Sequence, residues 1–188
     1  EPPAGRDAPD VRIEVLSQPR FLAGVREMMA AIASRLGLDE TGASKVALAV
    51  DEALCNVIRH GYDQRPDGRI EVSVWITGNA AQAASNCGSA DNGRAGGGML
   101  IRIDDEGKQT DPERIRSRDL TDIRPGGLGV HIINEVMDLV KYEKRKPIGM
   151  RLTMVKVVPD GAADAGADAR TDKQSGNQRG EGPARGAR

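Results

Sequence analysis

The stretch Asp51-Glu52-Ala53-Leu54-Cys55-Asn56-Val57-Ile58-Arg59-His60 decides the fold. Its apolar residues continue a helical stripe from Val46, which predicts a helix that Asp39 caps and that continues to about His60. Glu52 and Asn56 are four residues apart, hence on one face, and His60 extends their row. An amide oxygen is a hard ligand suited to a divalent ion, and a carboxylate can deprotonate a nucleophile beside it. A solvated polar face is the alternative that the spacing leaves open.

Apolar and polar residues alternate along other parts of the chain, as in strands with one buried face. These strands are expected over Val11–Val15, Arg69–Thr77, Met99–Asp104, Leu139–Lys144 and Gly149–Val158. Helical spacing predicts two further helices, over Phe21–Leu36 and Leu128–Met137. Met28 and Met29 lie at helical spacing and are interpreted as core. The order β-α-α-β-β-α-β-β predicts an α+β sandwich with helices on one face of a largely antiparallel sheet.

The composition indicates that only part of the chain forms a core. Of 188 residues, 38% are hydrophobic and 2% are aromatic, so the apolar side chains must gather in one region. Residues 159–188 contain no large apolar side chain, and residues 78–98 are small and polar, which predicts a disordered tail and a mobile hairpin insertion. With residues 1–10 as a flexible N-terminus, residues 11–158 remain as one domain of ordinary size.

Charge and cysteine usage exclude several classes of protein. The formal net charge is -1, which excludes a polybasic protein and gives no reason to expect direct contact with nucleic acid or a membrane surface. Cys55 and Cys87 are too few for a disulfide scaffold, and no apolar run is long enough for a signal peptide or a membrane span. We therefore expect a cytoplasmic protein. The first residue is Glu1 rather than Met, so a processed form or a fragment of a longer protein stays open.

Two further motifs, later in the chain than this helix, contain residues suited to binding a ligand. Asp105 and Gly107 end an apolar strand, where a carboxylate can accept a hydrogen bond from an exocyclic amine and a glycine lets a flat ring approach the backbone. An ordinary turn is the alternative. Gly126-Gly127-Leu128-Gly129 opens the last helix, where free backbone N–H groups favour phosphate, although such glycines also occur for packing.

The segment between these motifs, residues 110–125, is rich in arginine. Its basic residues are Arg114, Arg116, Arg118 and Arg124. The pattern leaves two interpretations open, a basic lid over phosphates and a charged surface loop.

The motifs, taken in this order, resemble those of the GHKL or Bergerat-fold histidine kinase-like ATPases. The segments 48–62 (LAVDEALCNVIRHGY) and 126–138 (GGLGVHIINEVMD) are most similar to the anti-sigma-factor serine/threonine kinases of bacterial partner-switching systems. The resemblance covers roughly residues 11–158. It implies a two-layer sandwich of the Bergerat type, with a mixed, mostly antiparallel sheet and helices on one face.

The resemblance also implies roles for individual residues. Glu52 matches the general base that activates a serine hydroxyl of the protein substrate, and Asn56 matches the Mg²⁺ ligand. Asp105 matches the carboxylate that reads the adenine amine of ATP, with Gly107 beside the ring. The glycines whose backbone approaches the phosphates match Gly126, Gly127 and Gly129. His60 is often His in this subfamily, and a packing histidine is the alternative for it.

The sequence departs from the family's pattern in three places. Gln109 stands where the wider family's D-x-G-x-G motif has its second glycine. Met150 and Arg151 follow Gly149 where the family commonly has Gly-Thr, so a threonine that would support the adenine contact is missing. The insertion at residues 78–98 is longer than this hairpin usually needs, and we expect it to face away from the nucleotide.

The resemblance implies an ATP-dependent serine-protein kinase and anti-sigma factor that binds a sigma factor and phosphorylates a STAS-type anti-sigma antagonist. A homodimer through the sheet side is a further implication. Trp75 lies on the polar phase of its strand, which predicts an exposed contact residue. The alternative function is a nucleotide-binding or pseudo-kinase regulatory module, part of a larger phosphatase or sensor protein. A histidine-kinase catalytic domain is a third interpretation, although the chain lacks room for long dimerisation helices.

Overall fold

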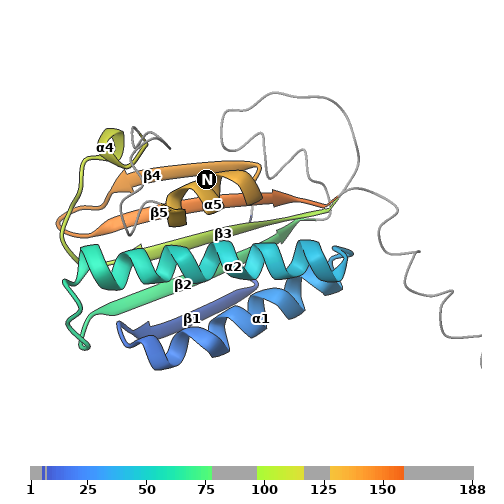
Figure 1. The fold of residues 1–188 in the computed structure, drawn as a ribbon, viewed down its shortest axis with the longest axis horizontal. Helices are drawn as coiled ribbons and strands as arrows, with labels where there is room; N and C mark the ends of the chain where they lie inside the picture. The colour runs from blue at the N-terminus through green and yellow to red at the C-terminus, as the bar shows by residue number, and fades with distance from the viewer. Residues whose placement is uncertain (1–5, 7, 78–96, 117–127, 159–188) are drawn as a thin grey trace, which may run out of the picture.

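A five-stranded sheet forms one layer of the protein (Figure 1). The computed structural model describes residues 6, 8–77, 97–116 and 128–158. In spatial order the strands are β1 (Val11–Leu16), β2 (Arg69–Thr77), β3 (Gly98–Asp105), β5 (Met150–Val157) and β4 (Leu139–Lys144). All neighbouring pairs of these strands are antiparallel. The expected α+β sandwich is confirmed, but within the described residues the sheet has no parallel pair, where a mixed sheet was expected.

The second layer consists of helices on one side of this sheet (Figure 1). Its members are α1 (Leu22–Arg35), α2 (Glu40–Asn56) and α5 (Leu128–Val136), and a short 3-10 helix, η1 (Pro19–Phe21), leads into α1. Asp39 caps α2 as expected, since its side chain accepts a hydrogen bond of 2.7 Å from the backbone N–H of Gly42. A short helix that the pattern did not predict, α4 (Pro112–Arg116), lies in the arginine-rich segment.

The end of the second helix differs from the expectation. The predicted helix to about His60 changes after Asn56 into a π-helix, η2 (Val57–Gly61). A π-turn is wider than an α-turn, so His60 does not continue the row of Glu52 and Asn56 in regular α-helical geometry. Such turns are frequent at functional sites, and this one borders the cavity described below.

The core lies between the two layers. Met29 is fully buried and Met28 is partly buried against the core, so both methionines are core residues as expected. The largest fully buried side chains from the strands in this cluster are Ile70, Met99, Ile101, Ile103 and Met154, all at most 1% exposed. Close packing of this kind fixes the orientation of α2 relative to β3, which positions the candidate site.

The prediction of an exposed Trp75 is wrong, because its side chain is only 2% exposed. It forms a second apolar cluster with Leu100 and Val155, on the face of the sheet opposite to the core. The strand register explains the burial, since Trp75 pairs with Leu100, and Leu100 pairs with Val155. The guanidinium of Arg102 lies 4.8 Å from the centre of the Trp75 ring.

The boundaries of the expected flexible segments are only partly covered by the structure. Gly98, the last residue of the expected insertion, begins β3 and pairs with Thr77. Most of the insertion, the tail at residues 159–188 and most of residues 1–10 lie outside the described residues, so the flexibility of these segments stays a prediction. None of the helices in the described ranges has both the length and the apolar character needed to cross a membrane.

Gly68 provides a test of the packing beside the candidate site. A Cβ at Gly68 would overlap the ring of Tyr62, which is 2% exposed and cannot move aside freely. We expect Gly68→Ala to lower the free energy of unfolding by about 1 to 3 kcal/mol, the usual cost of overpacking. Chemical denaturation measures this change.

Gly24 is the matched control for that substitution. It lies on the exposed side of α1, and a Cβ there would have no atom within 4 Å. We expect Gly24→Ala to raise the free energy of unfolding by about 0.5 to 1 kcal/mol, because alanine favours a helix. Equal effects of the two substitutions would contradict the packing described around Tyr62.

Candidate functional site

A cavity of about 480 Å³ lies where α2 and η2 meet the strand ends. Its floor consists of Ile103, Leu152 and Tyr142, which form one row across β3, β5 and β4. Asn56 and His60 line it from the helical layer. The cavity therefore has an apolar floor, with polar groups arranged at its edge, which is the usual composition of a small-molecule site.

Asp105 is the buried acidic residue of this cavity. It ends β3 and is 3% exposed. Its Oδ1 accepts hydrogen bonds from the backbone N–H groups of Gly107, at 2.7 Å, and Met150, at 3.2 Å. Burial raises the pKa of Asp105, while these two hydrogen bonds and the nearby Arg145 oppose that rise. Within the described residues both bonds fall on Oδ1, which leaves Oδ2 as an acceptor for a ligand.

Glycines allow the chain to approach closely around Asp105. Gly107 lies against the backbone of Gly61, where a Cβ would be 2.6 Å from the Gly61 carbonyl oxygen. Gly149 has a φ of +89°, and a Cβ there would overlap the carbonyl oxygen of Asp105. The backbone N–H of Lys108 donates to the Gly61 carbonyl at 2.8 Å. The loop after β3 is thus held between η2 and the turn before β5.

Two of the departures from the family pattern have structural explanations. Met150 orients Asp105 through its backbone N–H, a contact that does not depend on its side chain. Gln109 donates from its side chain to the carbonyl oxygen of Arg145, at 2.5 Å, and so connects the loop after β3 to the β4–β5 turn. Arg145 in turn donates to the carbonyl oxygen of Asp105 at 2.7 Å.

Glu52 and Asn56 lie together at the start of α5. A Cβ at Gly129 would be 2.5 Å from Oε2 of Glu52 and 3.4 Å from Nδ2 of Asn56. The absence of a side chain at Gly129 therefore lets the Glu52 carboxylate lie against the backbone at the start of α5. These three predicted residues meet in the structure, and Asn56 also lines the cavity that contains Asp105.

The donor set at this point fits a single Mg²⁺ ion bound together with phosphates. No group of three or more His, Cys, Asp or Glu side chains forms a metal cage among the described residues. Mg²⁺ usually binds one or two protein oxygens, together with water and substrate phosphates, rather than a protein cage. Asn56 lines the cavity and carries one amide oxygen, a hard ligand that suits that mode of binding.

The remaining sequence candidates have different outcomes. Burial raises the pKa of the Cys55 thiol, which fits its interpretation as a small helix residue rather than a nucleophile. Lys108 and Asp63 form an exposed ion pair of 3.1 Å at the edge of the cavity. The following predicted residues lie outside the described side chains: Gly126, Gly127, Arg114, Arg116, Arg118 and Arg124. The basic lid therefore stays a prediction.

Sequence reasoning missed Tyr62, which supports the site from behind. Its hydroxyl donates to the carbonyl oxygen of Arg69 and accepts a hydrogen bond of 2.8 Å from the backbone N–H of Glu106. Burial raises the pKa of Tyr62, so it remains a neutral donor. The residue ends the quoted motif LAVDEALCNVIRHGY, but no local pattern shows that its hydroxyl reaches the loop after β3.

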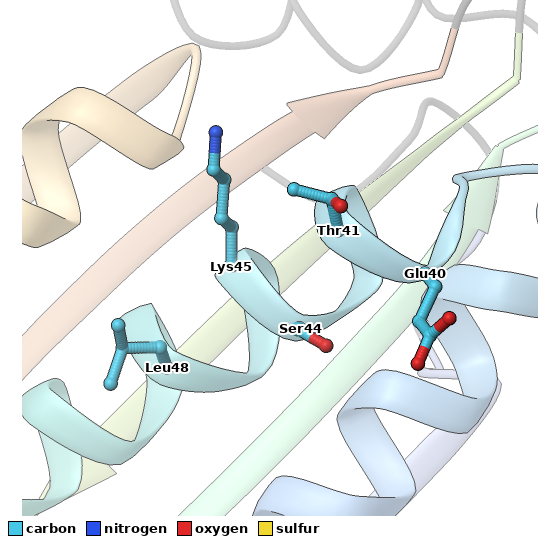
Figure 2. Close-up of a pocket in the computed structure, with 5 residues that line it drawn as sticks. All are labelled: Glu40, Thr41, Ser44, Lys45 and Leu48. Carbon is cyan, nitrogen blue, oxygen red and sulfur yellow. The ribbon is translucent and has the colours of Figure 1, made fainter.

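A second hollow lies on the outer surface of α2 (Figure 2). All five residues drawn along it come from this one helix: Glu40, Thr41, Ser44, Lys45 and Leu48. Figure 2 shows Glu40 and Lys45 pointing to opposite sides of the helix. This arrangement does not gather polar groups around one point, so the cavity at Asp105 is the better candidate.

The neighbouring carboxylates Asp104 and Asp105 provide a test of the electrostatics. Because the pKa of Asp105 is raised on folding, ionisation of this group destabilises the folded state as the pH rises above the ordinary Asp pKa of about 4. Asn at this position can still accept both backbone hydrogen bonds without a buried charge. We therefore expect Asp105→Asn to raise the free energy of unfolding at pH 7, with the gain disappearing below about pH 4.

Asp104→Asn is the control on the opposite face. Asp104 accepts two hydrogen bonds of 2.7 Å from Arg151, so we expect its replacement to lower the free energy of unfolding by about 1 kcal/mol. Urea denaturation between pH 4 and pH 8 measures both variants. A loss of stability in Asp105→Asn at pH 7 would contradict the burial cost assigned to Asp105.

Comparison with known proteins gives one consistent family. Residues 15–156 match the model of the histidine kinase-like ATPase domain. The serine-protein kinase RsbW of Halalkalibacterium halodurans is 27% identical over 154 residues, covering 78% of this chain and 82% of that protein. RsbW of Bacillus subtilis is 22% identical over 144 residues, covering 76% of this chain and 83% of that protein.

A solved structure also matches, the histidine kinase domain of a blue-light activated histidine kinase from Erythrobacter litoralis. It has a TM-score of 0.41 and 13% sequence identity, and the match covers 73% of this chain and 59% of that one. The family model spans most of the chain, including the helix with Glu52 and Asn56, the strand end at Asp105 and the start of α5. The chain belongs to the histidine kinase-like ATPase domain family.

Proposed function

We propose that this protein is an ATP-dependent serine-protein kinase that acts as an anti-sigma factor. The observation that carries the proposal is one cavity with Asp105 on its wall and Asn56 at its edge, beside Glu52 and Gly129. An acceptor for a base amine and a ligand for a phosphate-bound metal are thus joined through a single space. That combination suits a purine nucleoside triphosphate.

The adenine base would lie on the apolar floor formed by Ile103 and Leu152. Oδ2 of Asp105 would accept a hydrogen bond from the exocyclic amine, which favours adenine over guanine because guanine presents a carbonyl oxygen at that position. The carboxylate is already held by two backbone N–H groups before a ligand binds. This preorganisation reduces the ordering cost of binding.

The triphosphate would extend toward the start of α5. There the backbone of Gly129 and the adjacent glycines Gly126 and Gly127 would approach the phosphates, where the N-terminal end of a helix favours negative charge. Mg²⁺ bound by Asn56 and phosphate oxygens would neutralise part of that charge.

Glu52 would act as the general base in the transfer step. Its carboxylate takes the proton of a substrate serine hydroxyl as Oγ forms a bond to the γ-phosphorus. The bond between that phosphorus and the β,γ-bridging oxygen breaks at the same time, and ADP leaves. In-line geometry and a positioned base account for most of the rate gain in such reactions.

The protein partners are proposed from the similarity to serine-protein kinases named RsbW. We propose that the protein binds a sigma factor and phosphorylates a STAS-type antagonist. The unphosphorylated antagonist would draw the kinase off the sigma factor, and phosphorylation would end that competition. A homodimer remains part of this proposal, and a strict monomer in sedimentation at micromolar concentration would remove it.

A pseudo-kinase regulatory module is the alternative. The threonine that is missing at Met150 supports this alternative, although the backbone N–H of Met150 still orients Asp105. This contact favours retained nucleotide binding. The two functions then differ in whether phosphate is transferred.

Calorimetric titration of Mg-ATP tests nucleotide binding. We expect micromolar affinity for the unaltered protein. Asn56→Ala should weaken the affinity at least about tenfold, because it removes the amide oxygen that would bind the Mg²⁺ ion. The same titration with EDTA in place of Mg²⁺ should reproduce the weakening. Absence of binding by the folded, unaltered protein would leave only an interaction module.

Glu52→Gln tests phosphate transfer separately. The amide keeps the shape of the side chain but cannot take a proton, so we expect transfer to a STAS-domain protein to fall by about 10² to 10⁴ while Mg-ATP affinity stays within about twofold. Radiolabel transfer from γ-labelled ATP measures the rate. Unchanged transfer would remove Glu52 as the base.

A further inference from the structure

The turn between β4 and β5 contacts Asp105 through a side chain that the proposed mechanism does not use. The guanidinium of Arg145, in this turn, donates a hydrogen bond of 2.7 Å to the backbone carbonyl oxygen of Asp105. Its Nε lies 4.0 Å from Oδ2 of Asp104. Arg145 is absent from the described residues that line the cavity, so it would act on a bound ligand through Asp105 rather than by contact.

Gln109 fixes this turn against the loop after β3. Its side-chain amide donates to the carbonyl oxygens of Arg145, at 2.5 Å, and Gly149, at 3.3 Å. The backbone N–H of Arg145 donates to the same Gly149 carbonyl at 2.9 Å, which closes the turn. One side chain therefore holds both ends of the turn, so the guanidinium of Arg145 extends from a fixed backbone.

The surroundings of the Asp105 carboxylate influence its ionisation in opposite directions. Burial raises the pKa of Asp105, and the negative charge of the neighbouring Asp104 adds to that rise. The two backbone hydrogen bonds on Oδ1 and the positive charge of Arg145 lower the pKa. Tyr62 stays neutral beside it, because burial raises the pKa of this phenol. The other described titratable groups that line the cavity with Asp105 are His60, Asp63, Lys108 and Tyr142.

We propose that Arg145, held in place by Gln109, is a positioning residue that keeps Asp105 a hydrogen-bond acceptor and so selects a base with an exocyclic amine. The inference rests on the proposed nucleotide site and adds residues that determine its selectivity. An ionised carboxylate only accepts hydrogen bonds, whereas a protonated carboxyl group also donates one. A protonated Asp105 would be able to pair with the carbonyl oxygen of guanine, so the selection of adenine would weaken.

Calorimetric titrations of Mg-ADP and Mg-GDP at pH 5.5 and pH 8 test the role of the charge. Loss of the Arg145 cation raises the pKa of Asp105 further, so more of the carboxyl group is protonated at the lower pH. We expect Arg145→Met to weaken Mg-ADP binding about three- to tenfold at pH 5.5 and less than about threefold at pH 8. Its preference for Mg-ADP over Mg-GDP should fall at pH 5.5 by a similar factor. Comparison of the proteins at one pH removes the titration of the nucleotide itself.

Two matched variants separate the charge from the packing. Arg145→Lys keeps a positive charge and a donor, so its preference at pH 5.5 should stay within about twofold of that of the unaltered protein. Arg151→Met removes a guanidinium that donates to Asp104 and is not among the influences on Asp105, so this preference should again change less than about twofold. Equal losses of affinity in Arg145→Met and Arg145→Lys at both pH values would show a purely structural role and overturn the proposal.

Gln109→Met tests whether Gln109 acts through Arg145. Methionine is similar in size but has no donor for the two carbonyl oxygens of the turn. We expect a fall in the preference for Mg-ADP of about two- to fivefold at pH 5.5, and no further fall when this change is added to Arg145→Met. Gln18→Met is the control, because the Gln18 amide donates to the carbonyl oxygen of Pro66 at 3.1 Å and neither residue lines the cavity. Additive losses in the double variant would overturn the role given to Gln109.

The remaining outcomes separate this inference from the proposed function. Circular dichroism at pH 5.5 establishes that each variant is folded before titration. Arg145→Gln, which also removes the charge, replaces Arg145→Met if the latter unfolds. Binding of Mg-ADP with a preference that loss of the Arg145 charge does not change at pH 5.5 would overturn this inference alone. Failure of the unaltered protein to bind either nucleotide would overturn both proposals.

Discussion

The candidate site depends on one buried carboxylate, Asp105, at the end of β3. Burial opposes its ionisation, and two backbone N–H groups on Oδ1 partly offset that cost. These donors come from Gly107 on one side and Met150 on the other, so a single side chain connects the loop after β3 to the start of β5. Close approach is possible because Gly107 and Gly149 lack a Cβ. A group held this firmly, at a cost to the fold, is typical of a binding site.

The rest of the architecture positions this carboxylate relative to the helical layer. The core between α2 and the sheet fixes where Asn56 and Glu52 lie, and Gly129 lets α5 approach the Glu52 carboxylate closely. The π-turn η2 lets the chain widen after Asn56, so that Gly61 can contact the loop after β3. Tyr62 then ties η2 to both Arg69 and Glu106. The helical layer, the sheet and the loop after β3 therefore meet around one cavity. They are held there by several direct contacts between segments that are far apart in the sequence.

The structure shows the contacts of two residues that depart from the family pattern, Met150 and Gln109. The backbone N–H of Met150 donates to Asp105, a contact that does not depend on its side chain and does not replace the threonine that would support the adenine contact. Gln109 replaces a glycine and uses its side chain to hold the β4–β5 turn. Both residues thus take part in the contacts that hold the loop after β3, Met150 through its backbone and Gln109 through its side chain.

The sequence alone determined the local structure and the chemistry of the motifs. Periodicity located the strands and helices, Asp39 marked a helix start, and the spacing of Glu52 and Asn56 placed both on one helix face, because these features depend only on neighbouring residues. The tertiary structure decided what depends on register and on contacts distant in the chain. Strand pairing buried Trp75 beside Leu100, against the expectation, and packing brought Tyr62 to Glu106 and Tyr142 to the cavity. Such contacts are set by how whole elements pack, which no short pattern encodes.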